Sequence, residues 1–132
     1  MLQDNEPLLV INVQCGEAYS VRGSTQDIVM IPFTGTAESS LFKGNIIGTG
    51  VDTQFIKKGE KAFLSARYML EGVDINGQKC RIFIHNQGDD MSCCKPTVVT
   101  DSKALAELET TELRSVVTPA EGGVTVRIYK EI

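Results

Sequence analysis

The sequence predicts an all-β fold, an antiparallel β-barrel, with a β-sandwich as the alternative. Glycines punctuate short runs rich in Val, Ile, Leu and aromatic residues, with no repeat period and no linker-like change in composition. The pair Asn76-Gly77 lies between two of these runs and is a strong hairpin signal. A barrel is favoured because closing a sheet removes its exposed edges. We expect one domain over residues 1–132, since this length is enough to bury a core without metals or disulfides.

The strands follow from the β-rich runs. Ala62–Val73 and Gln78–Gln87 are predicted to form one hairpin, because Asn and Gly both tolerate the positive φ of a tight turn. Apolar and polar residues alternate over residues 124–129, the period of a strand with one buried face. Pro32 marks an edge or a bulge within its run. The remaining runs are Leu8–Val13, Tyr19–Arg22, Ile28–Phe33 and Phe42–Ile47.

One short helix is predicted near the C-terminus, over Ser102–Leu108. Asp101 or Ser102 can cap its first amides. Ala104, Leu105 and Leu108 form an apolar stripe at helical spacing. The expected architecture is therefore a β-barrel with a single late helix.

Charge and hydropathy exclude several partners. With 13 basic and 17 acidic residues, the net charge is -4, and no cluster of Lys or Arg is present to neutralise a row of phosphates. Nucleic acids and anionic membranes are therefore not expected partners. The longest apolar stretch, Leu8–Ile11, is far shorter than the roughly 20 residues of a spanning helix. Met1–Pro7 lacks the positive start and apolar stretch of a secretory signal, so we expect a cytoplasmic protein.

No cofactor or metal is predicted from the motifs. The glycines from Gly44 to Gly50 are not followed by the lysine and hydroxyl of a Walker loop, nor by a helix, so they indicate a turn or bulge. The segment His85–Cys94 has the wrong spacing for a standard zinc site, although a reactive or solvent-facing loop remains open there. No nucleophile elbow surrounds any serine. The four cysteines, two of them adjacent at Cys93 and Cys94, are expected to be reduced thiols.

Arg67 is the one charged residue inside a run that otherwise looks half buried. Leu64, Ala66, Tyr68 and Leu70 share the apolar parity of this run, and Arg67 has the opposite parity. Arg67 therefore points either to solvent or into a barrel lumen. In a lumen it would need a carboxylate partner such as Asp52 or Glu71.

Several short motifs follow one another in a characteristic order. They are Gly44-Asn45-Ile46-Ile47, Gly50-Val51-Asp52, Ala66-Arg67-Tyr68-Met69-Leu70, Asn76-Gly77 and Ile82-Phe83-Ile84-His85-Asn86-Gln87-Gly88. Their order and spacing resemble the bacterial and fungal domain-of-unknown-function family 3237 (DUF3237), also called uncharacterised protein family 0311, over most of the chain. The resemblance implies a calycin-like antiparallel barrel of about eight to ten strands and no established common activity.

The same resemblance carries Asp52 and Arg67 over as candidate site residues. The chain departs from the family pattern at Thr53, where a tryptophan is common, and in the acidic, cysteine-containing loop Asp89–Cys94. From the order of the motif we predict that Asp52 and Arg67 form an internal charge pair.

The function expected first is binding of a small apolar or anionic organic molecule in the barrel lumen. Arg67 would hold its polar group, and Asp52 would orient Arg67. The alternative is an isomerase or lyase acting next to a carbonyl, with Asp52 or His85 as general base and Arg67 stabilising negative charge. A third alternative is a filled barrel that associates with itself or with another chain. The tentative ligand-binding residues are thus Asp52, Arg67 and His85, and a homo-oligomer is an open possibility.

Overall fold

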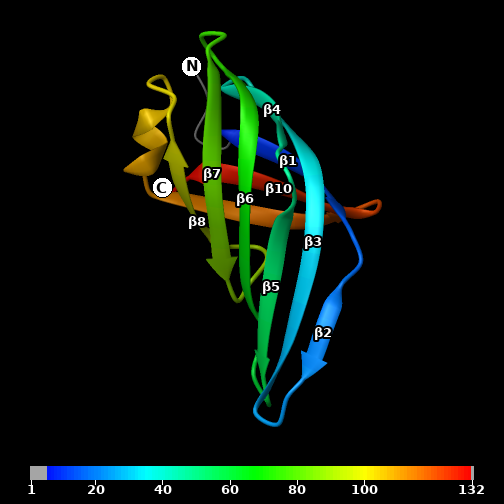
Figure 1. Ribbon diagram of the computed structural model, residues 1–132. Helices are drawn as coiled ribbons and strands as arrows, with labels where there is room; N and C mark the ends of the chain where they lie inside the picture. Colours follow the sequence, from blue (N-terminus) through cyan, green and yellow to red (C-terminus); the bar gives the residue numbers. More distant parts are fainter. Residues whose placement is uncertain (1–5, 132) are drawn as a thin grey trace.

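The computed structural model describes residues 6–131, so the expectation that rests on Met1–Pro7 falls largely outside the described residues. Within this range, ten strands form a single antiparallel sheet that curls into a barrel-like shape (Figure 1). The all-β prediction is confirmed. The strands are β1 (Leu9–Cys15), β2 (Tyr19–Arg22), β3 (Gln26–Glu38), β4 (Phe42–Ile46), β5 (Gly50–Lys57), β6 (Phe63–Asp74), β7 (Lys79–Gly88), β8 (Lys95–Thr100), β9 (Leu113–Ala120) and β10 (Gly123–Lys130).

The order of the strands brings the two ends of the sheet together. It runs β8-β7-β6-β4-β3-β1-β10-β9, with β5 between β3 and β6 beyond the end of β4, and β2 on the edge of β3. Cys94, just before β8, and Ser115 in β9 exchange both backbone hydrogen bonds, at N···O distances of 3.0 and 2.9 Å. The sheet therefore closes at this bridge. In Figure 1, β1, β10 and β9 cross behind β6 and β7 at a steep angle, so the core lies between two halves of one sheet.

Alternation along the strands decides which side chains enter that core. The inward-facing residues are almost entirely apolar, and several have no exposed surface at all. The most deeply buried include Leu9 and Ile11 of β1, Phe42 of β4, Leu70 of β6, Ile82 and Ile84 of β7, and Ile128 of β10. Because parity is fixed along each strand, these residues also show which of their neighbours point outward.

The predicted hairpin is confirmed as β6 and β7, but its turn differs from the expected one. Residues 75–78 connect the strands, and only Gly77 has a positive φ, of 76°. Asp74 organises the turn instead, since its Oδ1 accepts the backbone N–H groups of Asn76 and Gln78 at 2.9 and 3.1 Å. Its Oδ2 accepts the Ser102 hydroxyl at 2.6 Å, which ties the turn to the segment after β8.

The glycine-rich stretch between β4 and β5 interrupts what would otherwise be one long strand. A turn or a bulge was predicted there. Both β4 and β5 pair antiparallel with β3 and with β6, so they run in the same direction between the same neighbours. Gly48, with φ of 61°, lies in the break. Pro32 lies where β3 changes partner from β2 to β1, which agrees with its predicted bulge or edge position.

The predicted helix over Ser102–Leu108 is wrong in type and extent. The structure has a four-residue 3-10 helix, Ala106–Glu109, preceded by turns. The capping interaction and the apolar contacts were correctly placed: the Ser102 hydroxyl accepts the Leu105 N–H at 3.2 Å, and Leu105 and Leu108 are buried. Thr110 and Thr111 are weak helix formers and follow at once, so the segment does not extend into an α-helix. Strands β5, β8 and β9 were not predicted.

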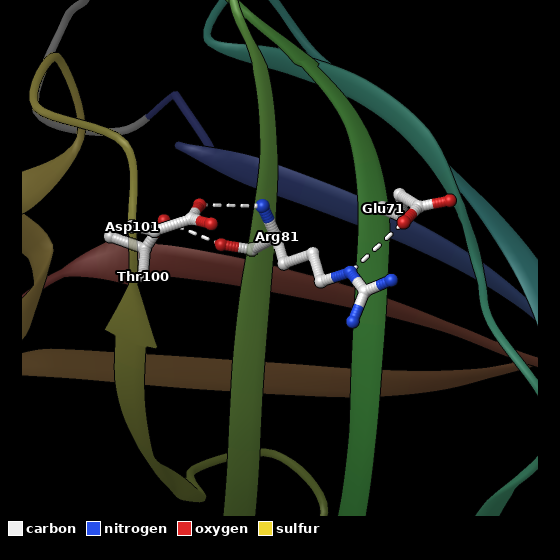
Figure 2. Close-up of polar contacts among 4 residues, drawn as sticks. All are labelled: Glu71, Arg81, Thr100 and Asp101. Atoms are coloured by element: carbon white, nitrogen blue, oxygen red, sulfur yellow. Dashed lines mark hydrogen bonds and ion pairs between the residues drawn. The ribbon is translucent and has the colours of Figure 1, made fainter.

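The outer face of β6, β7 and β8 carries a small polar network (Figure 2). Arg81 Nε donates to Glu71 Oε2 at 2.9 Å, and both side chains are about half exposed, so this ion pair adds little stability. The backbone of Arg81 is fixed more firmly, since its N–H donates to Asp101 Oδ1 at 2.8 Å and its carbonyl accepts the Thr100 hydroxyl at 2.7 Å. These contacts hold β8 in register with β7.

Among residues 6–131, no helix is long and apolar enough to cross a bilayer.

Gly50 is required by the packing of two core aromatic rings. A Cβ at this position would lie 2.5 Å from Phe33 Cε1 and 2.7 Å from Tyr68 Cβ. We expect Gly50→Ala to lower the free energy of unfolding by about 1 to 3 kcal/mol through overpacking, measured by denaturant unfolding. Ser20→Ala in the exposed strand β2 is the control and should change it by less than about 0.5 kcal/mol. A Gly50→Ala protein as stable as the wild type would contradict this packing.

Candidate functional site

A cavity of about 160 Å³ lies inside the curled sheet. Seven strands and the segment between β7 and β8 contribute to its wall, so it is enclosed by the sheet as a lumen would be. Most of the wall is aliphatic or aromatic, including Val13, Ile31, Phe33, Leu64, Val117 and Val126. The polar side chains on it are few, as is usual for small-molecule sites.

Strand register places the main polar groups of the wall in one row. Ile31 pairs with Asp52, Asp52 with Ala66, and Ala66 with Asn86, across strands β3, β5, β6 and β7. Residues directly opposite each other share a face of the sheet, so all of them point inward. The small Ala66 lies between Asp52 and Asn86 in this row, and all three residues line the cavity.

Only one of the two carboxylate oxygens of Asp52 accepts a hydrogen bond from the protein. Gln54 Nε2 donates to Asp52 Oδ2 at 3.0 Å, while Oδ1 is buried without a hydrogen-bond partner. Burial raises the pKa of the Asp52 carboxyl above its ordinary value, and the hydrogen bond from Gln54 opposes that rise. The carboxylate is therefore a better proton acceptor than a surface aspartate.

Tyr68 brings a second unpartnered polar atom to the same cavity. Its ring packs edge-on against Phe33, with centroids 5.4 Å apart, and its hydroxyl is buried without a hydrogen-bond partner. Burial raises the pKa of Tyr68 well above its ordinary value, so the hydroxyl stays protonated and remains a donor. Of the three buried side-chain oxygens without a partner among the described residues, two line this cavity.

Asn86 and Cys94 connect the cavity to the closure of the sheet. The Ser115 hydroxyl donates to Asn86 Oδ1 at 2.8 Å, and both residues are buried. Cys94 Sγ donates to the Asp90 carbonyl at 3.2 Å, and burial is the main cause that raises the pKa of the Cys94 thiol. Met91, in the same segment, lines the cavity and is itself 40% exposed, so the cavity reaches the surface there.

Arg67 and His85 lie on the opposite, outer face of the sheet. They pair with each other across β6 and β7, one position away from the inward-facing row. Arg67 is exposed, and the pKa of His85 is lowered by burial and by the Arg67 guanidinium. The Ser65 hydroxyl is 2.8 Å from His85 Nε2. The predicted internal charge pair of Asp52 with Arg67 is therefore wrong: the two side chains point to opposite faces.

The segment His85–Cys94 does not assemble into a ligand set. His85 points outward, Cys93 is exposed and Cys94 is buried against the cavity. Within residues 6–131, no three His, Cys, Asp or Glu side chains gather as metal ligands. All four cysteines are free thiols in this structure, with Cys15 exposed at the end of β1.

Sequence reasoning missed Tyr68 and Asn86, although each is the immediate neighbour of a residue it chose. The signal that could have found them is the alternation of side chains along a strand, which places residues two apart on the same face. Leu64, Ala66 and Leu70 mark the inward face of β6, and Tyr68 shares their parity while Arg67 does not. In β7 the buried Ile82 and Ile84 select Asn86 over His85 in the same way.

These features define the class: a small all-β protein whose barrel-like sheet encloses an apolar cavity with a few converging polar groups. The chain belongs to the family described as "Protein of unknown function (DUF3237)", whose model matches residues 4–90. This range includes Asp52, Tyr68 and Asn86 and confirms the resemblance inferred from the motifs. No curated protein matches the chain in sequence.

Solved structures of low sequence identity share the fold. A protein of unknown function from Clostridium acetobutylicum ATCC 824 is 20% identical, with a TM-score of 0.79 over 95% of this chain and 96% of that one. A "beta-barrel like protein" from Acinetobacter baumannii AYE is 19% identical, with a TM-score of 0.77 over 95% and 93%. A protein described as an enzyme from Penicillium herquei is 17% identical, with a TM-score of 0.71 over 93% and 92%.

The unpartnered hydroxyl of Tyr68 makes its removal favourable for folding. We expect Tyr68→Phe to raise the free energy of unfolding by about 1 to 3 kcal/mol, because a buried donor without a partner is lost and the ring contact with Phe33 is kept. Denaturant unfolding measures the change, and Tyr19→Phe, at a residue 66% exposed, is the matched control. A less stable Tyr68→Phe protein would mean that the hydroxyl has a stabilising partner.

Asp52 should make stability depend on pH in an unusual direction. Its pKa is raised in the folded state, so the ionised form is disfavoured by folding, and this cost is fully present above the folded pKa. The cost is relieved as pH falls from the folded pKa towards 3.8. We expect Asp52→Asn to be more stable than the wild type at pH 7, with the difference shrinking as pH falls through this window. Unfolding at several pH values measures it, and a difference that grew on acidification would refute the assignment.

Proposed function

We propose that this chain binds a small, mainly apolar organic molecule inside its curled sheet, with one polar group of the ligand held by Asp52 and Tyr68. The observation that carries the proposal is the pair of unpartnered atoms, Asp52 Oδ1 and Tyr68 Oη, on the wall of one otherwise apolar cavity. An unpartnered buried polar atom costs about 1 to 3 kcal/mol. A bound ligand that supplies a donor to Asp52 and an acceptor to Tyr68 removes that cost.

The size and the opening of the cavity support the same proposal. Its volume of about 160 Å³ is close to that of an engineered apolar cavity, about 150 Å³, that binds benzene, so it suits a molecule of about one ring. Cys15 and Met91 line it and are exposed, which provides a route for entry. A cavity of this size also favours ligand binding over a barrel filled by its own side chains. Self-association of the chain stays a prediction from the sequence.

The alternative function, acid–base chemistry next to a carbonyl, is favoured by one observation. Asp52 has a pKa raised by burial and lines the same cavity as Tyr68, whose hydroxyl remains protonated, a combination that general acid–base catalysis uses. His85 and Arg67 take no part in this version, because neither lines the cavity. A protein of the same fold, 17% identical, is described as an enzyme, which is compatible with this alternative.

The four free thiols support the further proposal that the chain works in a reducing compartment such as the cytoplasm.

Filling the cavity tests the proposed function. We expect some single-ring compounds to raise the melting temperature of the wild type, because a ligand at 100 times its dissociation constant adds about 2.7 kcal/mol of stability. Ala66→Leu places a larger side chain between Asp52 and Asn86 and should weaken this binding at least about tenfold. Arg67→Leu is the matched control, one residue along the same strand on the outer face, and should keep the response. Unchanged binding to the Ala66→Leu protein would place the ligand elsewhere.

A further inference from the structure

The charge of the cavity limits the ligands that it can accept. Among the described residues of its wall, Asp52 is the only aspartate or glutamate, and no lysine or arginine lines the cavity. A carboxylate or phosphate ligand would bring a second negative charge into an apolar space without a cation to balance it. The cavity therefore favours a neutral ligand, and not the anionic ligand that was expected when Arg67 was placed in the lumen.

The hydrogen-bonding groups narrow the choice further. Asp52 Oδ1 accepts only, while the Tyr68 hydroxyl has a hydrogen to donate. Asp52 lies opposite Ala66, and Tyr68 is two residues further along the same face, a diagonal pair roughly 7 to 8 Å apart at the backbone. A compact group that offers both a hydrogen and an acceptor oxygen satisfies both atoms through two contacts of about 3 Å. An alcohol has both features on one oxygen. An enolisable ketone has an acidic hydrogen on the carbon next to its carbonyl group and an acceptor at the carbonyl oxygen.

We propose that the cavity is a proton-transfer site for a neutral, enolisable cyclic ketone, with Asp52 as the base and Tyr68 as the hydrogen-bond donor to the carbonyl oxygen. This inference rests on the proposed function, since it assigns the ligand class and the reaction of the same site. The hydrogen on the carbon next to the carbonyl moves as a proton to Asp52 Oδ1. The electron pair of that C–H bond becomes the carbon–carbon double bond, and the carbonyl π pair moves to the oxygen that Tyr68 stabilises.

The reverse step completes the reaction without any other reactant. Asp52 returns its proton to the same carbon, or to a more distant carbon of a conjugated enolate, and the carbonyl is restored. No electron is gained or lost overall, so no oxidant or reductant is needed. Gln54 acts as a positioning residue, because its amide holds Asp52 Oδ2 and leaves Oδ1 directed at the ligand.

Hydrogen exchange in heavy water tests this reaction directly. Cyclohexanone is incubated with the full chain in D₂O, and deuterium at the carbons next to the carbonyl is measured by mass spectrometry against buffer alone. Cyclohexanol and cyclohexanecarboxylate, of the same ring size, are tested beside it for binding by thermal shift. We expect the ketone and the alcohol to bind more tightly than the carboxylate, and the ketone to exchange faster than in buffer.

The variants assign the two roles. Tyr68→Phe should slow the catalysed exchange by about 10² to 10³-fold, as expected for the loss of one donor to a developing oxyanion. Asp52→Asn should reduce it to the buffer rate. Both replacements keep the size of the side chain, and the unfolding measurements on the same proteins establish that they fold. His85→Gln and Arg67→Gln, on the outer face, should exchange the ketone as the wild type does.

Failure of this inference and failure of the proposed function give different results. If the ketone or the alcohol binds and exchange stays at the buffer rate, the site binds ligands but does not transfer protons, and the inference is overturned. Tighter binding of the carboxylate than of the ketone would also overturn it. If the Asp52→Asn protein exchanged the ketone at the wild-type rate, Asp52 would not be the base. If none of the single-ring compounds binds, both the inference and the proposed function fail.

Discussion

The register of β6 against its two neighbours is the constraint on which the rest of the site depends. Pairing of Ala66 with Asp52 on one side and with Asn86 on the other aligns three strands so that their even-numbered residues face inward. A shift of one residue would exchange the faces, bringing Arg67 and His85 into the core and exposing Leu70, Ile82 and Ile84. Burial of those large aliphatic side chains, each worth about 1.5 to 3 kcal/mol, makes that exchange very costly. Hydrophobic burial thus determines where the polar groups are.

Two long-range contacts then convert the register into a cavity. Gly50 lacks the side chain that would separate Phe33 from Tyr68, so the two rings meet edge-on and fix the position of the Tyr68 hydroxyl. At the opposite side of the lumen, the Cys94–Ser115 bridge joins the ends of the sheet, and the Ser115 hydroxyl also holds Asn86. The same residue therefore closes the sheet and orients a group of the wall. Neither contact is local in sequence.

Much of the fold was predictable because hairpins and alternation are local signals. The β6–β7 hairpin, the last strand and a turn or bulge in the stretch around Gly48 were all predicted from neighbouring residues. Strand β5 was missed because its polar residues Asp52, Thr53 and Gln54 interrupt the expected β pattern, and Asp52 and Gln54 are the residues that line the cavity. The motif order led to the right segments of the chain, but it selected Arg67, and His85 was chosen for its chemistry. Parity, which was available, selects Tyr68 and Asn86 instead.

Comparison with Asp74 shows why Asp52, the carboxylate on the wall of the cavity, is the one to associate with function. Asp74 is buried and fully used by the fold: it accepts two backbone N–H groups and the Ser102 hydroxyl, and these contacts lower its pKa. Asp52 lies within β5, and one of its oxygens has no partner while burial raises its pKa. A sequence under selection for stability alone would replace such a residue with an apolar or a fully bonded one, since the change is favourable. The cost of Asp52, and that of the Tyr68 hydroxyl in the same cavity, is explained if both groups are satisfied by a molecule that the chain itself does not supply.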